Sequence, residues 1–230
     1  MSYPEIPLAQ SILQIVKAKG IQHIIVSPGS RNAPLTIGFT NDPYFTCYSI
    51  VDERCAAFFA MGIAQQTLEP TAILCTSGSA LLNYYPAIAE AFYSQIPLIV
   101  LSADRPTNKI DIGDGQTIRQ RNVFENHTLF NANLSEYANK ENDELIQKAI
   151  FLSRAKKGPV HINAPFEEPL YNVVSNFTYT PFIVQDQENI LEESELVSFE
   201  KLLNTPKIIV LIGSQNVNAI SQENINFLAE

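Results

Sequence analysis

Short, unbroken runs of apolar residues alternate with longer stretches of helical periodicity along most of this chain. Strands that are apolar on both sides belong to parallel sheets whose two faces are covered by helices. The sequence therefore predicts an α/β fold, with helices on both faces of a parallel sheet, followed by the start of a second α/β domain. The predicted order is helix 5–19, strand 23–26, a helix starting over 33–39, strand 45–51, helix 53–66, strand 72–75, helix 79–94, strand 97–102, helix 142–155 and strand 159–163.

The composition changes in the C-terminal third of the chain, where Pro, Asn, Gln, Glu and Thr become frequent. We expect a first domain over residues 1–180, a linker over 181–194 and the truncated start of a second domain over 195–230. A helix near 195–203 and an apolar strand at 207–214 are predicted to open this second unit.

The formal net charge of −9 argues against nucleic acid or an anionic membrane surface as a partner. Five of the six arginines nevertheless lie between positions 31 and 121, which favours binding of small anions, although ordinary surface ion pairing is also compatible. The three cysteines lack metal-ligand spacing and are interpreted as buried thiols in a reducing compartment. No signal peptide and no apolar stretch near the ~20 residues that span a bilayer are evident, so we predict a cytoplasmic protein without stable membrane insertion.

Three segments lie where a predicted strand passes into a helix, at residues 27–35, 52–57 and 76–80. Open α/β sheets bind their ligands at such junctions. The middle segment has Glu53 at the start of a helix that is otherwise rich in small apolar residues, with Asp52 as its candidate cap. Glu53 is either a first-turn acid favoured by the helix dipole or a functional carboxylate.

The other two junctions carry polar groups suited to anions. Backbone N–H groups after Ser27 lie at a helix N-terminus, and Arg31 would add a guanidinium beside them, although an ordinary tight turn is also compatible. At 76–80 a serine nucleophile is not supported, because Gly-x-Ser-x-Gly is absent and no His–Asp pair is evident. A helix cap with close packing or an anion contact is the better interpretation.

A long segment after the fourth predicted strand has no predicted structure of its own, which is typical of functional or disordered loops. Arg105, Gln116 and Arg119 in this segment are candidate contacts for carboxylates. The role of His127 stays open. His161, in the last apolar strand, is predicted to be a core histidine with its hydrogen bonds satisfied.

Six motifs occur in order along the chain. They are Ser-Pro-Gly-Ser-Arg-Asn-Ala-Pro-Leu (27–35), Asp-Glu-Arg-Cys-Ala-Ala-Phe-Phe-Ala-Met-Gly (52–62), Thr-Ser-Gly-Ser-Ala (76–80), Ser-Ala-Asp-Arg-Pro (102–106), Gly-Gln-Thr-Ile-Arg-Gln (115–120) and Gly-Pro-Val-His-Ile-Asn-x-Pro-Phe-x-Glu-Pro-Leu (158–170). Together they closely resemble the 2-succinyl-5-enolpyruvyl-6-hydroxy-3-cyclohexene-1-carboxylate (SEPHCHC) synthases, thiamine-diphosphate enzymes of menaquinone biosynthesis. The match covers the N-terminal, pyrimidine-binding domain of that family, and the later strand and glycine turn resemble the start of its middle domain.

The resemblance implies roles for the residues at these junctions. In thiamine enzymes a glutamate hydrogen-bonds the aminopyrimidine ring and favours the imino form that deprotonates the thiazolium carbon. By motif position this catalytic, cofactor-binding glutamate is Glu53, and Thr76, Ser77 and Gly78 would line the cofactor pocket.

The implied reaction decarboxylates 2-oxoglutarate and adds the succinic semialdehyde unit to isochorismate, giving SEPHCHC and CO2. Because both substrates are dicarboxylates, the resemblance also accounts for the collected arginines. Four residues match positions that would contact isochorismate or the adduct: Ser30, Arg31, Arg105 and Gln116.

The cofactors implied are thiamine diphosphate and Mg²⁺. The Mg²⁺ ligands are expected in a C-terminal domain absent from this chain, so no metal ligand is predicted here. The family forms each active site between two subunits, which implies a homodimer or homotetramer with the small-residue helix at 53–64 as a candidate dimer face. We therefore expect a portion of a transferase that is inactive alone.

Two alternative functions stay open. One is another thiamine-dependent decarboxylase or an acetohydroxyacid-type synthase, which would prefer pyruvate to 2-oxoglutarate. The other is a non-catalytic α/β module that binds a small anion or a partner.

Overall fold

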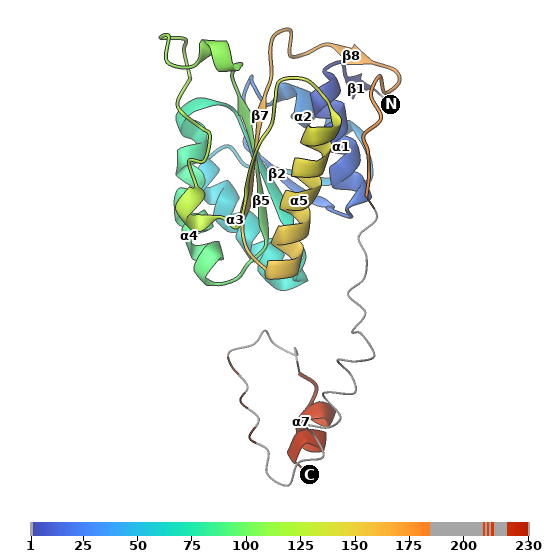
Figure 1. Ribbon diagram of the computed structural model, residues 1–230, viewed down its shortest axis with the longest axis vertical. Helices are drawn as coiled ribbons and strands as arrows, with labels where there is room; N and C mark the ends of the chain where they lie inside the picture. The colour runs from blue at the N-terminus through green and yellow to red at the C-terminus, as the bar shows by residue number, and fades with distance from the viewer. Residues whose placement is uncertain (1, 185–208, 210, 212, 214–219, 230) are drawn as a thin grey trace. The chain divides into compact units, whose positions relative to one another are not determined.

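The computed structural model describes residues 2–184, 209, 211, 213 and 220–229 of the chain. The chain divides into two compact units, Met1–Gln185 and Asp186–Glu230 (Figure 1). In the second unit the described residues form one helix, α7 (Gln222–Ala229). The helix expected at 195–203 lies outside the described residues, and so does most of the strand expected at 207–214.

The first unit is built on a six-stranded sheet in which every neighbouring pair is parallel. Its strands are β2 (His23–Val26), β3 (Thr46–Ser49), β4 (Thr71–Cys75), β5 (Leu98–Asp104), β6 (Asn131–Asn133) and β7 (Val160–Pro165), in the order β3-β2-β4-β5-β7-β6. A separate antiparallel pair joins β1 (Tyr3–Pro4) to β8 (Val173–Val174). The predicted parallel sheet is confirmed, whereas β1, β6 and β8 were not predicted.

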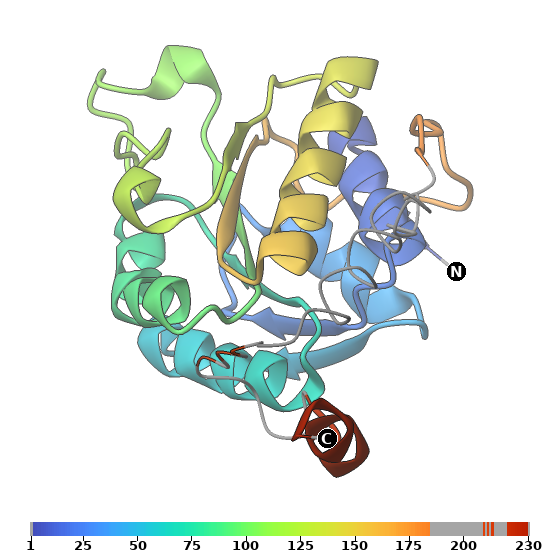
Figure 2. The ribbon, with the colours of Figure 1, turned by 60° about the horizontal axis from the view of Figure 1, so that its bottom comes forward.

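Helices cover both faces of this sheet, as predicted (Figure 1, Figure 2). They are α1 (Pro7–Ala18), α2 (Ala33–Asn41), α3 (Glu53–Thr67), α4 (Tyr85–Tyr93) and α5 (Lys140–Lys156), with the short 3-10 helices η1 (Gly78–Tyr84), η2 (Thr107–Lys109) and η3 (Glu125–His127). One hydrophobic layer contains α1, α2 and α5, and the other contains α3, α4 and η1. No helix in the described part of the chain is long and apolar enough to cross a membrane.

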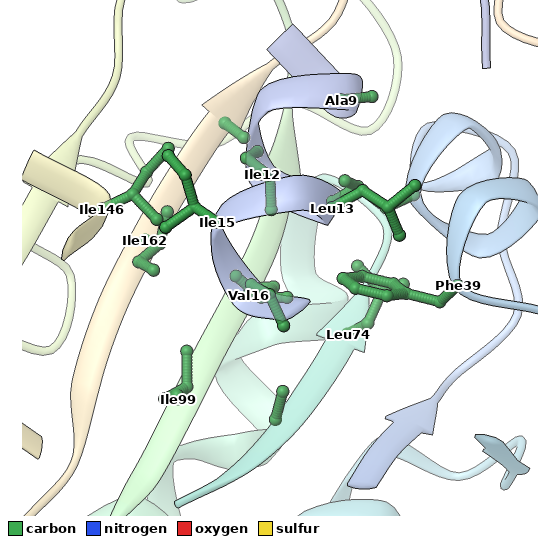
Figure 3. Close-up of a cluster of buried hydrophobic side chains, with 14 of the residues drawn as sticks. Ala9, Ile12, Leu13, Ile15, Val16, Phe39, Leu74, Ile99, Ile146 and Ile162 are labelled. Carbon is green, nitrogen blue, oxygen red and sulfur yellow. The ribbon is translucent and has the colours of Figure 1, made fainter. Parts of the chain in front are cut away.

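Neighbouring residues of a core strand face opposite layers, which explains why the strand sequences are apolar throughout. In β4, Leu74 belongs to the layer that contains α1, whereas Ile73 belongs to the layer that contains α3. Figure 3 shows Leu74 and Ile99 of the sheet on the same side as Ile12 and Val16 of α1.

The helix expected at 79–94 is divided into η1 and α4. Pro86 occupies the first turn of α4, where a backbone N–H would have no intrahelical partner, so the missing N–H of proline costs no hydrogen bond. The predicted kink or restriction at Pro86 is therefore confirmed.

The alanines of α3 face the sheet of their own unit. Ala56, Ala57 and Ala60 are fully buried in the second layer, while Phe58 and Phe59 lie on the outer face with 41% and 44% of their surface exposed. The helix is therefore buried on one face only. The alanines allow close packing of α3 on its own sheet, and any partner would meet the phenylalanines instead.

The cysteines differ in burial, which corrects the expectation that all three are buried. Cys75 is buried in β4, Cys47 is half-buried and Cys55 is exposed. Cys55 lies in the first turn of α3 on its outward side, and its N–H donates to Asp52 Oδ1 at 2.8 Å. Asp52 is therefore the helix cap that the sequence predicted.

An extended segment over residues 178–184, here called the strap, is held by side chains of α1 and α5. Gln10 Oε1 accepts from the N–H groups of Thr178 and Tyr179 at 2.8 and 3.1 Å. Gln147 donates to Phe182 O at 2.7 Å and accepts from Val184 N at the same distance. These glutamines bind the backbone of the strap, and two of the residues that they contact, Phe182 and Val184, belong to the linker predicted from the sequence. The domain boundaries themselves stay a prediction.

The order of the strands creates a topological switch point between β2 and β4. The chain leaves β2 for β3 on one side and then returns to β4 on the other side. The turns that follow β2 and β4 touch each other there: a Cβ added to Gly29 would lie 2.4 Å from Thr76 Cβ. Only glycine fits at position 29 without moving Thr76.

His161 is a fully buried core histidine of β7. Ser102 Oγ donates its single proton to Asn163 Oδ1 at 2.8 Å, so the 2.7 Å contact between Ser102 Oγ and His161 Nε2 requires a proton on that nitrogen. His161 Nδ1 has no partner among the described residues. The predicted core role is confirmed, but the histidine is satisfied at one nitrogen only.

We expect Gly29→Ala to lower the free energy of unfolding by about 1–3 kcal/mol, because its Cβ would overlap the Thr76 side chain. Gly62→Ala in α3 is the matched control, since no atom lies within 4 Å of its added Cβ. Alanine should raise helix stability there by roughly 0.5–1 kcal/mol. Urea unfolding of both variants measures the difference, and equal effects would contradict the close approach of the two turns.

Burial lowers the pKa of His161 from 6.5 to about 3. As the pH falls below 6.5, His161 becomes protonated in the unfolded chain but stays neutral in the folded chain. The free energy of unfolding therefore falls as the pH is lowered from 6.5 towards 3. Between pH 6.5 and 5 we expect a loss of about 2 kcal/mol from this group. Urea unfolding should give a shallower pH dependence for His161→Gln, and an unchanged dependence would contradict a neutral buried His161.

Candidate functional site

A cavity of about 450 Å³ lies at the switch point, beyond the carboxyl ends of β2 and β4. Ligands of open α/β sheets bind at this kind of position. Residues from both turns, from α3, from η1 and from the long loop line the cavity: Pro28, Gly29, Ser30, Glu53, Thr76, Ser77, Ser79, Ala80, Asn83 and Gln116. The three junctions singled out in the sequence therefore meet at one cavity.

Glu53 is the only ionisable side chain among the lining residues. It is the first residue of α3 and is partly exposed. The capping position is already filled by Asp52, so Glu53 does not cap the helix. Its carboxylate lies in the first turn of α3, where the helix dipole favours negative charge.

The turn after β4 is fixed by contacts on both sides. Thr76 Oγ1 accepts from the Arg31 N–H at 3.1 Å, which joins it to the turn after β2. Gly78 has a φ of +89°, and a Cβ there would lie 2.9 Å from Gln116 O. Between these two residues, the Ser77 hydroxyl is buried at the cavity wall with no hydrogen-bond partner among the described residues.

Arg31 is 4% exposed and is held by the segment after β7. Its Nη1 donates to Phe166 O at 2.9 Å and its Nη2 to Glu168 Oε1 at 3.0 Å. The sequence predicted a guanidinium beside the helix N-terminus, and the structure shows that two of its donors are engaged within the chain. Arg31 Nε is buried without a partner among the described residues.

Arg105 lines a second cavity, of about 310 Å³, at the carboxyl ends of β5, β6 and β7. Its Nη2 donates to Gly115 O at 3.0 Å, and its Nη1 lies 3.9 Å from Glu168 Oε1. The same carboxylate oxygen therefore lies between Arg31 and Arg105. Ser30 and Gln116 line the first cavity, whereas the two arginines meet at Glu168 beside it.

Two other candidates from the long loop have local contacts. Arg119 Nε lies 2.9 Å from Asp111 Oδ2, and both side chains are exposed, so this pair contributes little to stability. Arg119 also lines the second cavity. His127 Nδ1 lies 2.9 Å from the Tyr85 hydroxyl, in an aromatic cluster between α4 and η3.

A buried polar network connects the two cavities, and the sequence analysis did not identify it. Asn163 Nδ2 donates to Asp104 Oδ2 at 2.7 Å, and the Arg105 N–H donates to Asp104 Oδ1 at 2.7 Å. Burial raises the pKa of Asp104, while these hydrogen bonds and the charges of Arg121 and Arg31 oppose the rise. One available signal was Asn163 itself, a polar side chain inside a strand that is otherwise almost entirely apolar.

No cluster of three or more His, Cys, Asp or Glu side chains within the described ranges could hold a metal ion. The chemistry of the first cavity therefore depends on one carboxylate, several hydroxyls and amides, and backbone groups of two close turns.

Comparison with known proteins agrees with this geometry. The family described as thiamine pyrophosphate enzyme, N-terminal TPP binding domain, matches residues 6–132, more than half of the chain. A SEPHCHC synthase of Flavobacterium psychrophilum is 64% identical over 230 residues, which is 100% of this chain and 42% of the relative. A SEPHCHC synthase of Flavobacterium johnsoniae is 65% identical over 221 residues, which is 94% of this chain and 40% of the relative.

Among solved structures, the thiamine diphosphate-dependent 4-hydroxybenzoylformate decarboxylase of Rhodococcus jostii RHA1 has the same fold. Its TM-score is 0.62 at 19% sequence identity, over 69% of this chain and 30% of that chain.

The chain spans about two fifths of the length of these curated relatives. The resemblance found in the six motifs is confirmed by the 64% identity of the Flavobacterium psychrophilum relative over the whole of this chain. The chain belongs to the thiamine pyrophosphate enzymes and contains their N-terminal TPP-binding domain.

Proposed function

We propose that this chain is the N-terminal part of a SEPHCHC synthase, a thiamine-diphosphate-dependent transferase of menaquinone biosynthesis. The names of the relatives support the synthase assignment. In the proposed reaction, 2-oxoglutarate is decarboxylated and the succinic semialdehyde unit is added to isochorismate. The observation that carries the proposal is the position of Glu53, the one ionisable group lining the switch-point cavity of a TPP-binding domain.

The residues present fit the aminopyrimidine end of thiamine diphosphate. This ring is planar and polar at its edge, and the cavity offers the Glu53 carboxylate, the unpartnered Ser77 hydroxyl and the Asn83 amide. Gly29 lets the turn after β2 approach Thr76, and Gly78 lets the turn after β4 approach the backbone of Gln116 in the long loop. When bound, thiamine diphosphate supplies the electron sink for decarboxylation.

Glu53 is the catalytic residue of this proposal. Its carboxyl group would hold a proton against a ring nitrogen of the pyrimidine, and the start of α3 fixes its direction. Because Asp52 already caps α3, Glu53 is free for this role. Thr76 and Gly78 would fix the turn that carries Ser77, which lines the cofactor pocket.

The substrates are proposed to bind beside the cofactor through Ser30, Arg31, Arg105 and Gln116. Both substrates are dicarboxylates, and guanidinium groups bind carboxylates through paired N–H donors. Arg31 and Arg105 share the carboxylate of Glu168, and Arg105 Nη1 also lies 3.6 Å from Asp114 Oδ2. A substrate carboxylate would take the place of one of these carboxylates at the guanidinium groups.

The other binding sites of the cofactor and the other subunits are proposed to be supplied by parts of the protein outside this chain. The Mg²⁺ ligands and the diphosphate site are proposed for a C-terminal domain of the longer protein, so the isolated fragment is expected to be inactive. A homodimer or homotetramer is proposed, with the exposed phenylalanines on the outer face of α3 as a candidate contact. A cytoplasmic location is proposed from the free thiols of Cys47, Cys55 and Cys75.

In the full-length protein, Glu53→Gln should lower kcat by roughly 10²–10⁴-fold, because the amide cannot hold and return a proton. Its stability should change little. Asp52→Ala is the matched control: it removes the cap from the same helix turn, so it should lower the free energy of unfolding and leave kcat largely intact. Comparable kcat values for Glu53→Gln and the native protein would exclude the catalytic role.

The substrate assignment predicts that consumption of 2-oxoglutarate depends on isochorismate when the full-length protein has thiamine diphosphate and Mg²⁺. The assay follows loss of 2-oxoglutarate with and without isochorismate, and pyruvate serves as the competing substrate. A preference for pyruvate would favour an acetohydroxyacid-type synthase or another decarboxylase. No turnover and no cofactor binding would favour a non-catalytic anion-binding module.

A further inference from the structure

Gln120 ends the motif Gly-Gln-Thr-Ile-Arg-Gln and has no part in the function proposed above. It is 1% exposed, although it lies in the long loop between β5 and β6. Its Oε1 accepts from the Gly78 N–H at 2.8 Å, and its Nε2 donates to Ala103 O at 3.1 Å and to Asn163 Oδ1 at 2.9 Å. One side chain from the loop therefore joins the turn after β4 to the ends of β5 and β7.

These contacts form a continuous chain of hydrogen bonds between the two cavities. At one end, the Gly78 N–H follows directly after Ser77 in the wall of the switch-point cavity. At the other end, Asn163 donates to Asp104, and Asp104 accepts from the Arg105 N–H. Gln120 is the member that spans the gap, and it also lines the second cavity.

The contacts require the chemistry of glutamine at this position. One end of the side chain must accept from an N–H group, while the other end must donate to two oxygen atoms. Glutamate could still accept from Gly78, but its ionised carboxylate could donate to neither Ala103 O nor Asn163 Oδ1. Asparagine is one methylene shorter and could not span the same three partners at these distances.

Gln120 also determines how the loop meets the turn after β4. The Gly78 N–H is held by Gln120, while the Cα of Gly78 lies against the backbone of Gln116. Loss of the Gln120 contact would free the turn on the side away from Thr76, and Ser77 would move with it. Gln116 would lose its fixed neighbour at the same time.

We propose that Gln120 is a positioning residue that holds the Gly78 turn and the Asp104–Arg105 segment in register. It thereby couples the switch-point cavity to the second cavity, which Arg105 lines. This inference rests on the proposed function, because it assigns thiamine diphosphate to the first cavity. Gln120 acts through Gly78 and Asn163, and it is not among the residues that line the switch-point cavity, to which thiamine diphosphate is assigned.

The test uses the full-length protein with three substitutions: Gln120→Ala, Gln120→Glu and the matched control Gln147→Ala. Gln147 is also a buried glutamine with three backbone partners, namely Asp143 O, Phe182 O and Val184 N, but it binds the strap. The measurements are the dissociation constant of thiamine diphosphate by calorimetric titration with Mg²⁺, the melting temperature, and KM and kcat with isochorismate.

We expect both alanine variants to melt at lower temperature, because each leaves buried backbone groups unpaired. Only the Gln120 variants should weaken thiamine diphosphate binding, by roughly tenfold, the factor that corresponds to loss of one such contact. Gln120→Glu is expected to shift the dissociation constant in the same direction. If Gln120→Ala does not fold, the dissociation constant of Gln120→Glu alone tests the inference.

Unchanged cofactor binding in the folded Gln120 variants would overturn the inference, and so would an equal weakening in Gln147→Ala. These results differ from failure of the proposed function. If the native protein itself binds no thiamine diphosphate, the proposed function is wrong. If it binds the cofactor but does not use isochorismate, the substrate is wrong and the binding comparison still tests Gln120.

Discussion

The contact between the turns after β2 and β4 is the constraint on which the rest of the first unit depends. Gly29 lies against Thr76 so closely that no side chain fits between them, and the Arg31 N–H donates to Thr76 Oγ1. This contact closes the switch point of the sheet on one side and opens the candidate cavity on the other. Glu53 reaches the same cavity because α3 begins immediately after β3, the strand on the far side of β2.

Buried polar side chains give the site its second level of order. The hydrophobic layers fix the sheet and helices and also anchor the long loop after β5 through Phe124, while polar contacts fix the part of the loop beside the site. Gln120, Asn163 and Asp104 are buried and supply these contacts through directional hydrogen bonds. Such groups are expensive to leave unpaired, so a loop that satisfies all of them has few alternative positions.

The sequence predicted those features whose causes are local. Unbroken apolar runs predicted β2, β4, β5 and β7, and Pro86 predicted the interruption before α4. β6 escaped prediction because it reads Asn-Ala-Asn and pairs with a strand that comes later in the chain. Its pairing depends on tertiary position rather than on apolar periodicity.

The candidate site likewise contains residues that the sequence could identify and contacts that it could not. Glu53 was identifiable because a carboxylate stands before a row of small residues, and the junction residues followed from strand ends. The engagement of Arg31 was not identifiable, since its partner Glu168 is 137 residues away.

The strap, residues 178–184, also depends on groups that are distant in the sequence. Gln10 and Gln147 bind main-chain groups of the strap, and among the described residues only the hydroxyls of Thr178 and Tyr179 add side-chain hydrogen bonds to α1 and α5. Substitutions at the other positions of residues 178–184 therefore leave the main-chain contacts in place. The amino-acid sequence of most of this segment could therefore change during evolution while its backbone keeps the same path along α1 and α5.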